Sequence, residues 1–402
     1  MFGSVILFCV FLILIYLWKY KKPENFPPGP TPRPVIGNVM DLPKGHLYLK
    51  VEEWSKIYGQ IIGLRIFNDL AVFVTGVDNI LLALRKEEFQ SRPDIFSVKT
   101  RNYGKSLGLF FGTGDQWNST RKFTVKQMRA FGKFEKVNLI VEEINQLMET
   151  IKDGTMQETI QEHRESLDPN NPRDLIDSYL IEMDCNKGNP DSRFTEEDLI
   201  VLGTDLFSAG AESTSNSIEF VLLYMILYPE VQEKMQEEID RVLGRGRKPV
   251  LDDKANLHYT MAVLNEVERI NSVVPTNVPH YCVKDTTFGG YFIPKGTLIS
   301  MNLRSLGYDP KYWKNPEEFH PERFLDSEGK YVKPSNMPSF GIGQRTCVGE
   351  MMARTSIFLF TTTFFEKFSI SLPAGEPKPS TVALPGFTTA PQPFKIDVKS
   401  RY

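Results

Sequence analysis

The chain has 402 residues, of which 41% are hydrophobic and 24% are charged, and both shares are close to the average for globular proteins. Global disorder is therefore excluded, and a formal net charge of −3 gives no electrostatic reason to bind nucleic acid. The four cysteines stand far apart without a CxxC pair, which excludes a disulfide scaffold and the usual zinc spacings. We expect reduced thiols and a folded part that faces the cytosol.

The N-terminal residues predict a membrane anchor. The first eighteen residues carry no charge, and three of the next four are lysine. A helix from Phe2 to Trp18 would be about 25 Å long, enough for a thin bilayer of the endoplasmic reticulum, and the lysines place the following chain in the cytoplasm. A cleavable signal peptide is the alternative, but it needs a basic start and a small-residue cleavage site. We predict a signal anchor over residues 1–20, a proline-rich hinge over 21–34 and one folded domain over 35–402.

Beyond the hinge, the hydrophobic patterns predict helices and a few short strands. The runs Ile61–Phe67 and Leu70–Thr75 are typical of two strands joined at Asn68-Asp69. Short strands are expected again around Tyr281–Asn302, where glycine-containing pairs mark turns. Long helices with apolar periodicity are expected at Lys133–Ile151, Thr195–Tyr228, Tyr259–Asn271 and Glu350–Phe368. Together these patterns predict a mostly α fold with small peripheral β-sheets.

The segment from Phe340 to Gly349, FGIGQRTCVG, is the most informative one. Its glycines allow the backbone to take positive φ and to approach a flat ligand closely, and a helix is predicted directly after it. The N–H groups at the start of that helix and the cation of Arg345 would stabilise Cys347 as a thiolate. A thiolate held in this way is a good axial ligand for haem iron. The alternative is a buried free cysteine after a turn.

The helix predicted for Thr195–Tyr228 carries a polar notch. Thr195 and Asp198 have the spacing of a capping box. The middle reads AGAEST, from Ala209 to Thr214, where a glycine and hydroxyls that bond the backbone would open the helix locally. A carboxylate and hydroxyls in an apolar wall would give protons a route while bulk water is kept out. The alternative is a helix crossing of small residues with a satisfied acid.

The cysteine loop resembles the haem-thiolate signature of the cytochromes P450, FxxGxRxCxG, at every position. The resemblance implies the cytochrome P450 fold, with haem b (iron protoporphyrin IX) as the cofactor. It also implies that Cys347 is the axial ligand of the haem iron, that Phe340 packs near this cysteine and that Arg345 pairs with a haem propionate.

The AGAEST stretch is similar to the oxygen-binding motif of the same family, (A/G)Gx(E/D)TT. The resemblance implies a catalytic group of Glu212, Ser213 and Thr214, with Glu212 as the acid and Ser213 as the alcohol of a proton relay. The family usually has threonine where this chain has Ser213. Because serine lacks the methyl group that fixes the rotamer, we expect some leakage of electrons to peroxide.

Two further motifs resemble structural parts of the family. Glu266 and Arg269 can pair across one helical turn. The stretch from Asn315 to Phe324 resembles the family's PxxFxPxxF, which implies that Arg323 joins the pair in a buried charge triad. Its role would be structural, holding the cysteine loop, and loss of one member should leave uncompensated buried charge.

Other residues resemble contacts of the haem propionates. Trp117 and Arg121, one helical turn apart, match the family's WxxxR, and His280 resembles a further propionate contact. Arg92 is a weaker candidate. The basic stretch that begins at Arg121 would suit docking of an acidic electron donor, and ordinary solvation is the alternative; its members are Arg121, Lys122, Lys126 and Arg129.

The resemblance runs from the anchor to Tyr402 and is strongest to the family-2 animal microsomal enzymes, but a central segment is missing. Only 95 positions (212 − 117) separate Trp117 from Glu212, and the family has nearly twice as many. We predict the join near residues 151–158, between parts that resemble the fourth and the seventh helix. The lost helices would supply the roof of the substrate pocket, so apolar faces become exposed and water gains access. An alternative splice product or an incomplete gene model would each explain the gap.

The resemblance implies a haem-thiolate monooxygenase anchored in the endoplasmic reticulum membrane, with its domain in the cytoplasm. It would insert one atom of O₂ into a small lipophilic substrate of xenobiotic, steroid or fatty-acid type. Electrons would come from NADPH through NADPH–cytochrome P450 reductase, with cytochrome b5 as a second candidate donor. Pocket-lining candidates are Val274–Val278 and Gly386–Pro391. Two alternatives are a truncated, catalytically impaired haem-binding membrane protein and a haem-thiolate isomerase, against which the intact AGAEST relay argues.

Overall fold

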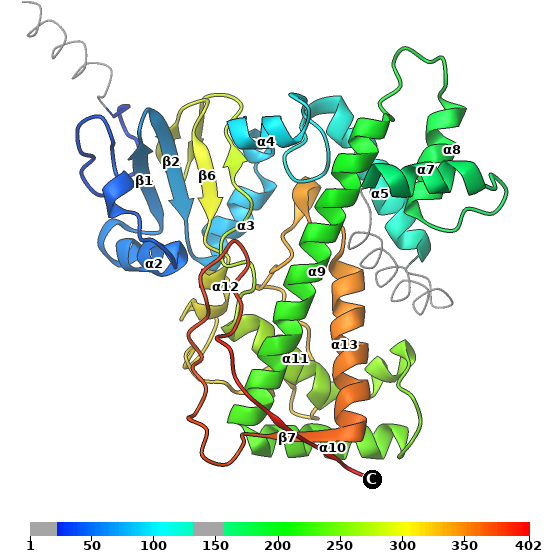
Figure 1. Ribbon diagram of the computed structural model, residues 1–402. Coiled ribbons are helices and arrows are strands. Elements are labelled where there is room, and N and C mark those ends of the chain that lie inside the picture. Colours follow the sequence, from blue (N-terminus) through cyan, green and yellow to red (C-terminus); the bar gives the residue numbers. More distant parts are fainter. Residues whose placement is uncertain (1–21, 132–155) are drawn as a thin grey trace, which may run out of the picture. The chain divides into compact units, whose positions relative to one another are not determined.

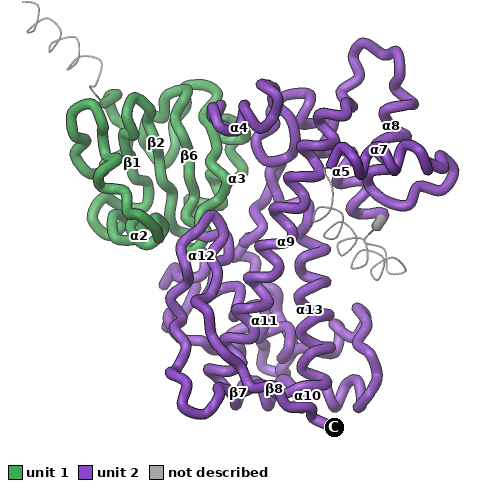
Figure 2. Tube along the Cα trace, in the orientation of Figure 1, with its two compact units in different colours: residues 1–91, 276–305 green, residues 92–275, 306–402 purple. Residues whose placement is uncertain are grey.

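A computed structural model describes residues 22–131 and 156–402. The chain falls into two compact units, residues 1–91 with 276–305 and residues 92–275 with 306–402, which Figure 2 shows in different colours. The predicted anchor over residues 1–20 and the predicted helix Lys133–Ile151 lie outside the described residues. Among the helices that are described, none combines the length and the apolar character needed to cross a bilayer.

Unit 1 is built around a four-stranded sheet with the strand order β1-β2-β6-β3. The first two strands pair antiparallel, β6 pairs parallel with β2, and β3 pairs antiparallel with β6. Helix α2 packs its buried Val51 and Trp54 against apolar side chains of β1 and β2. The bounds are β1 Ile61–Ile66, β2 Asp69–Val74, β3 His280–Tyr281, β6 Leu298–Met301 and α2 Leu47–Tyr58. The unit also contains η1 Val39–Asp41, α3 Val77–Arg85, η2 Glu87–Phe89 and the hairpin of β4 Thr286–Phe288 with β5 Tyr291–Ile293.

The predicted β1–β2 hairpin is confirmed, but its turn lies one residue earlier than expected. The pairing of Ile66 with Asp69 leaves Phe67 and Asn68 in the turn, and Phe67 has a φ of 51°. A bulky residue seldom adopts this left-handed region, whereas asparagine and aspartate do so more often, which is why the local signal favoured Asn68-Asp69. Register is decided by the sheet instead, because a slip of one residue would turn the buried side chains to the opposite face.

Unit 2 is mostly helical, and the long helix α9 (Glu196–Leu227) runs through it in Figure 1. Helices α10, α11 and α13 pack against the C-terminal half of α9, and α5, α7 and α8 pack near its N-terminal half. Their bounds are α5 Gly114–Phe131, α7 Met156–Ser166, α8 Leu175–Cys185, α10 Pro229–Leu243, α11 His258–Ile270 and α13 Glu350–Lys367. Shorter elements are α4 Phe96–Arg101, η4 Leu251–Ala255, η5 Pro321–Phe324, η6 Gly343–Arg345, β7 Phe368–Ser371 and β8 Asp397–Ser400, and α12 Arg304–Tyr308 spans the division between the units.

Two apolar clusters hold the helices of unit 2 together. The cluster around the C-terminal half of α9 includes the fully buried Phe220, Phe358 and Phe365, and the cluster around the N-terminal half includes Tyr179 and Leu199. Full burial of each such side chain contributes about 1.5–3 kcal/mol. The predicted fold class, mostly α with small separate sheets, is confirmed.

Helix α9 begins and ends where the sequence predicted, but its middle differs. The Thr195 side chain accepts a hydrogen bond from the backbone N–H of Asp198 (3.2 Å), which caps the helix. The helix continues without a break through Ala209–Thr214, so the predicted local opening is wrong. Ser213 Oγ donates to the backbone oxygen of Ala209 (2.6 Å), and this bond satisfies the hydroxyl while the helical ladder stays intact.

Candidate functional site

The cysteine loop is a tight turn that ends at the first residue of α13. The Cys347 N–H donates to the backbone oxygen of Phe340 (2.9 Å), which closes the turn. Gly341 and Gly343 have φ of 75° and 78°, a region that glycine enters without the steric cost of a Cβ. The Cys347 side chain is exposed, so the loop presents an accessible sulfur directly before a helix N-terminus.

The electrostatics of the Cys347 thiol differ from the prediction in two respects. Although the side chain is exposed to solvent, the protein atoms around the sulfur partly desolvate it, which is the largest influence on its pKa and raises it. The N–H of Gly349 and the charge of Arg121 lower this pKa, and the charge of Glu350 raises it. The net direction of the pKa is upward when no metal ion is bound. The cation that acts on the sulfur is Arg121 rather than Arg345, because the Arg345 side chain is turned toward Trp117. A metal ion that binds a thiol removes its proton outright, so a bound iron ion would keep Cys347 deprotonated.

A group of arginines lies next to the cysteine loop. Arg121 Nη2 donates to the backbone oxygen of Thr346 (2.6 Å), the residue before Cys347. The Arg345 guanidinium lies 3.5 Å from the centre of the Trp117 ring, and that of Arg121 lies 5.5 Å from it. The structure therefore brings together four of the predicted cofactor contacts, Trp117, Arg121, Arg345 and Cys347.

The surroundings of this arginine group disfavour the charged form of its members. Burial and the charge of Arg121 lower the pKa of Arg345 to about 9. Burial and the charges of Arg345 and Arg121 also lower the pKa of Arg92, so Arg92, the weaker candidate from the sequence, belongs to the same group. Guanidinium groups that repel one another in a buried place are stabilised by an anion. Haem b carries two propionates, and these residues fit them.

The loop Leu107–Gly112, which the sequence analysis did not single out, holds these side chains in place. Its backbone oxygens accept from Trp117 Nε1 (at Leu109, 3.2 Å), Arg92 Nε (at Phe110, 2.8 Å) and Arg345 Nη2 (at Gly112, 2.9 Å). The indole N–H of Trp117 therefore has a backbone partner, and its predicted contact with a propionate stays a prediction.

Two buried aspartates of α9 fasten this loop to the helix. Asp205 Oδ2 accepts from the N–H groups of Leu109 (2.8 Å) and Phe110 (3.1 Å), and Asp205 also pairs with Arg101. Asp198 Oδ1 accepts from the N–H of Gly108 (3.0 Å). Asp198 and Asp205 are seven residues apart, so they lie on the same face of an apolar helix. This spacing is the signal that could have found both, but only Asp198 was predicted, as a capping residue.

The predicted proton relay lies on a stretch of α9 whose side chains are mostly not buried. Between residues 206 and 219 only Asn216 is buried, whereas the flanking turns are mostly buried. A Cβ built on Gly210 would meet no atom within 4 Å. Glu212 is exposed and its Oε1 accepts from Thr388 Oγ1 (2.5 Å), while Ser213 and Thr214 are half-buried. Thr388 was not predicted by itself, but it lies in the pocket-lining candidate Gly386–Pro391.

The two pocket-lining candidates are adjacent in part. The Thr389 N–H donates to the backbone oxygen of Val273 (2.8 Å), and its hydroxyl donates to that of Ser272 (3.1 Å). The loop Gly386–Pro391 is thereby fastened to the residues directly before Val274. The segment Val274–Val278 itself crosses the division between the two units.

The predicted charge triad forms in the interior of unit 2. Arg269 donates from Nε and Nη2 to the two carboxylate oxygens of Glu266 (2.6 and 2.8 Å), and Arg323 Nε donates to Glu266 Oε1 (3.0 Å). The side chains of Glu266 and Arg269 have no exposed area. Arg269 also donates to the backbone oxygens of Gly307 and Pro316 (2.6 and 2.7 Å), so it fastens the segment that precedes the cysteine loop.

The last predicted cofactor contact, His280, belongs to unit 1. It is 2% exposed, and its Nδ1 is hydrogen-bonded to the backbone oxygen of Phe89. Its contact with a propionate stays a prediction.

Comparison with known proteins shows the family. The model of the family described as cytochrome P450 matches residues 27–155 and 151–398. The chain belongs to the cytochrome P450 family. Farnesoate epoxidase of Bombyx mori is 31% identical over 490 aligned positions, which cover 99% of this chain and 98% of the relative. Cytochrome P450 2C3 of Oryctolagus cuniculus is 33% identical over 482 positions (98% and 98%), and cytochrome P450 2L1 of Panulirus argus is 32% identical over 476 (95% and 96%).

Membership of this family makes the protein a haem monooxygenase with haem b as its cofactor, and the relatives are predominantly family-2 enzymes. The alignment with farnesoate epoxidase is 88 positions longer than the 402 residues of this chain. Because that alignment covers both proteins almost completely, the residues that this cytochrome P450 lacks are internal ones.

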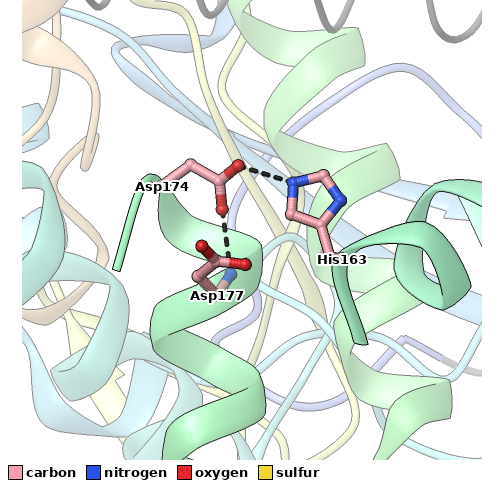
Figure 3. Close-up of side chains that lie close together, drawn as sticks. All are labelled: His163, Asp174 and Asp177. Atoms are coloured by element: carbon pink, nitrogen blue, oxygen red, sulfur yellow. Dashed lines mark hydrogen bonds and ion pairs between the residues drawn. The ribbon is translucent and has the colours of Figure 1, made fainter. Parts of the chain in front are cut away.

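A charged cluster away from the cysteine loop joins α7 to α8 (Figure 3). His163 Nε2 lies 2.7 Å from Asp174 Oδ2, and its Nδ1 lies 2.8 Å from the backbone oxygen of Thr159. Since both partners can only accept, both ring nitrogens donate and the imidazole is charged. Arg173 donates from Nε and Nη2 to Asp177 (2.7 and 2.8 Å). Although the ligand atoms of His163, Asp174 and Asp177 lie within 4.8 Å of one another, both carboxylates already have cationic partners, so this is a charge cluster rather than a metal site.

Replacing His163 by glutamine is expected to lower the free energy of unfolding by about 1 kcal/mol at pH 6 and by much less at pH 9. The hydrogen bond to Asp174 raises the pKa of His163, against the opposing effect of burial. The charged pair therefore stabilises the fold fully below about pH 6.5, the ordinary value, and this contribution is lost as the pH rises through the raised pKa. Urea unfolding of both proteins at the two pH values measures the difference.

Asp174→Asn is the matched variant for this prediction. Asp174 Oδ1 caps α8 by accepting from the Asp177 N–H (2.9 Å), and an asparagine oxygen can replace it. This variant should keep the helix cap and lose the pH dependence. A deficit of His163→Gln that is equally large at pH 6 and pH 9 would contradict the assignment.

Proposed function

We propose that this cytochrome P450 is a monooxygenase anchored in the endoplasmic reticulum membrane, which inserts one atom of O₂ into a small lipophilic substrate with electrons from NADPH. The observation that carries the proposal is the accessible sulfur of Cys347, presented by a glycine turn at the start of α13 beside a group of arginines. Bound haem would supply the activation of dioxygen, and the residues of the chain would hold the cofactor and control protons and water.

In this proposal Cys347 is the protein ligand of the haem iron. Arg92, Arg121 and Arg345 bind the propionates, whose charge would offset the burial and the mutual repulsion that lower the pKa values of Arg92 and Arg345. Phe340 fixes the turn by accepting the Cys347 N–H. Loop Leu107–Gly112 presents the arginines through its backbone oxygens.

Proton transfer is assigned to the exposed stretch of α9. Glu212 holds a carboxylate at the surface of the notch, where Thr388 donates to it, and it can receive a proton from solvent. Ser213 can pass a proton on by turning its hydroxyl away from Ala209, to which it now donates. A haem-thiolate isomerase would not need a proton relay such as Glu212 and Ser213.

The electron donor is proposed to dock on α5. A surface hollow of about 700 Å³ lies along this helix and is lined by Arg121, Lys122, Lys126 and Arg129 together with Gln344 of the cysteine loop. A basic surface next to the cysteine loop suits an acidic partner, which we take to be NADPH–cytochrome P450 reductase, with cytochrome b5 as a second donor.

The second candidate function is a haem-binding protein with impaired catalysis, and the internal gap is the observation that favours it. We propose that the join lies near residues 151–158; the family match in two segments, which overlap at 151–155, supports this position. Loss of the segment that would roof the substrate pocket would admit water to the site and divert electrons to peroxide.

Replacing Cys347 by serine is expected to abolish the strongly red-shifted Soret band of the reduced carbon monoxide complex, because only a thiolate ligand gives that shift. The measurement uses microsomes that contain the full chain, with haem supplementation. Cys185→Ser, at another exposed cysteine of unit 2, is the control and should keep the band. An unchanged band in Cys347→Ser would overturn the proposal; an intact band without NADPH-dependent product formation would favour the second candidate.

A further inference from the structure

We propose that Arg354 of α13 is a positioning residue that clamps the aromatic ring of Phe340 and so fixes the turn that carries Cys347. The inference deepens the proposed function, since it rests on Cys347 as the iron ligand. Arg354 lies one helical turn inside α13, and it belongs neither to the signature motif nor to the proton relay.

Arg354 is held from two sides. Its Nη1 and Nη2 donate to both carboxylate oxygens of Glu268 on α11 (2.9 and 3.2 Å), and its Nε donates to Glu350 on α13 (2.9 Å). All three side chains are between 22% and 32% exposed. A bidentate pair of this kind has one orientation of the guanidinium plane, so α11 and Glu350 together decide where the face of Arg354 points.

That face covers Phe340. The guanidinium carbon lies 4.6 Å from the centre of the Phe340 ring, within the range of a cation–π contact. Phe340 is also the residue whose backbone oxygen accepts the Cys347 N–H (2.9 Å). A ring fixed on its face therefore fixes the far end of the turn, and Arg354 acts on Cys347 through Phe340.

The arrangement also balances charge beside the sulfur. Glu350 is three residues from Cys347 and brings a negative charge to the start of α13. Its ion pair with Arg354 offsets that charge. Burial alone would lower the pKa of Arg354, but Glu268 and Glu350 outweigh it and raise the pKa, so the guanidinium stays charged in this position.

The test compares hydrogen exchange of residues 340–349 in haem-loaded full chains of the wild type, Arg354→Gln and Arg354→Lys. The expected result for Arg354→Gln is exchange of the Cys347 amide that is about tenfold faster, with a weakened but still red-shifted carbon monoxide band. Arg354→Lys should recover only part of the protection, because lysine keeps the charge but has no planar fork to orient on Glu268 and Phe340.

Arg401→Gln is the matched control. Arg401 also forms a bidentate pair, with Asp240 (3.0 and 2.8 Å), and is 14% exposed. It contacts the backbone oxygens of Phe365 and Glu366 at the opposite end of α13, about 24 Å from Glu350 along the helix. Its loss should destabilise the protein without a selective change in the cysteine loop.

Three outcomes would overturn the proposal: unchanged exchange of the loop in Arg354→Gln, an equal acceleration in Arg401→Gln, or full recovery in Arg354→Lys. If Arg354→Gln does not fold, Glu268→Gln releases one side of the clamp and is judged by the same criteria. Failure of the proposed function is distinguishable, because Cys347→Ser would then keep its band while the exchange results could still separate Arg354 from Arg401.

Discussion

Replacing Glu266 by glutamine is expected to lower the free energy of unfolding by about 3–5 kcal/mol, because it leaves two arginines with uncompensated buried charge. Glu266 neutralises Arg269, whose side chain has no exposed area, and Arg323, which is 10% exposed. It also accepts from the backbone N–H of His320 (2.7 Å). Glutamine can supply one acceptor oxygen, but it points an N–H group at a guanidinium. Urea unfolding at neutral pH, with haem content followed in parallel, measures the effect.

Glu328→Gln is the control for the loss of an ion pair as such. Glu328 pairs with Lys330 (2.7 Å), and both side chains are more than 60% exposed. Surface pairs of this kind contribute about 0–1 kcal/mol, so this variant should unfold like the wild type. If Glu266→Gln lowered the free energy of unfolding by less than about 1 kcal/mol, water or a rearranged neighbour would be reaching Arg269. The charge triad would then not hold the segment that precedes the cysteine loop.

The parts of the fold that depend on neighbouring residues in the sequence were predictable. Helix α9 starts at a Thr195 cap, and α11 follows from its apolar periodicity. The turn around Cys347 follows from its glycines, because Gly341 and Gly343 do adopt positive φ. Each of these features is decided within a few residues, so the sequence carries the complete signal.

The parts of the site that depend on distant segments were not predictable in the same way. Asp198 shows the difference. Its backbone N–H completes the predicted cap, but its carboxylate turns inward and bonds to Gly108, which precedes it by 90 residues. Likewise, Glu212 was expected from its motif, whereas its partner Thr388 is 176 residues away. Residue spacing along a helix predicts on which face of the helix a side chain lies, but it does not predict which distant residue that side chain contacts.

The cation beside Cys347 differs from the predicted one for a related reason. Arg345 is two residues from Cys347, and proximity in sequence suggested that it is the cation beside the sulfur. In the folded chain the guanidinium of Arg345 lies on Trp117, and Arg121 of α5 is the cation that lowers the thiol pKa. Arg345 is the last residue of the short helix η6, and Cys347 lies in the turn beyond it, so the charge next to the sulfur is decided by packing.

Replacing Asp198 by alanine is expected to have the second large effect, a loss of about 3–5 kcal/mol of unfolding free energy together with weakened haem binding. Asp198 is completely buried and accepts from three donors. These are the Gly108 N–H (3.0 Å), the Thr120 hydroxyl (2.6 Å) and the Tyr179 hydroxyl (2.9 Å). Each buried donor left without an acceptor costs about 1–3 kcal/mol, although Thr120 can still donate to Gln116. Urea unfolding gives the stability, and titration of the purified apoprotein with haem gives the binding.

Tyr179→Phe separates the role of the carboxylate from that of the helix contact between α8 and α9. It removes one donor while Asp198 keeps the other two, so the expected loss is about 1 kcal/mol, with haem binding unchanged. Burial is the main cause of the raised pKa of the Tyr179 phenol, and Asp198 adds to it, so the phenol stays protonated and can donate at every pH used. The Gly108 N–H is the contact that links Asp198 to the loop Leu107–Gly112. If Asp198→Ala lost stability but bound haem as tightly as Tyr179→Phe, the loop would hold the arginines without help from α9, and the assignment of Asp198 to the site would be wrong.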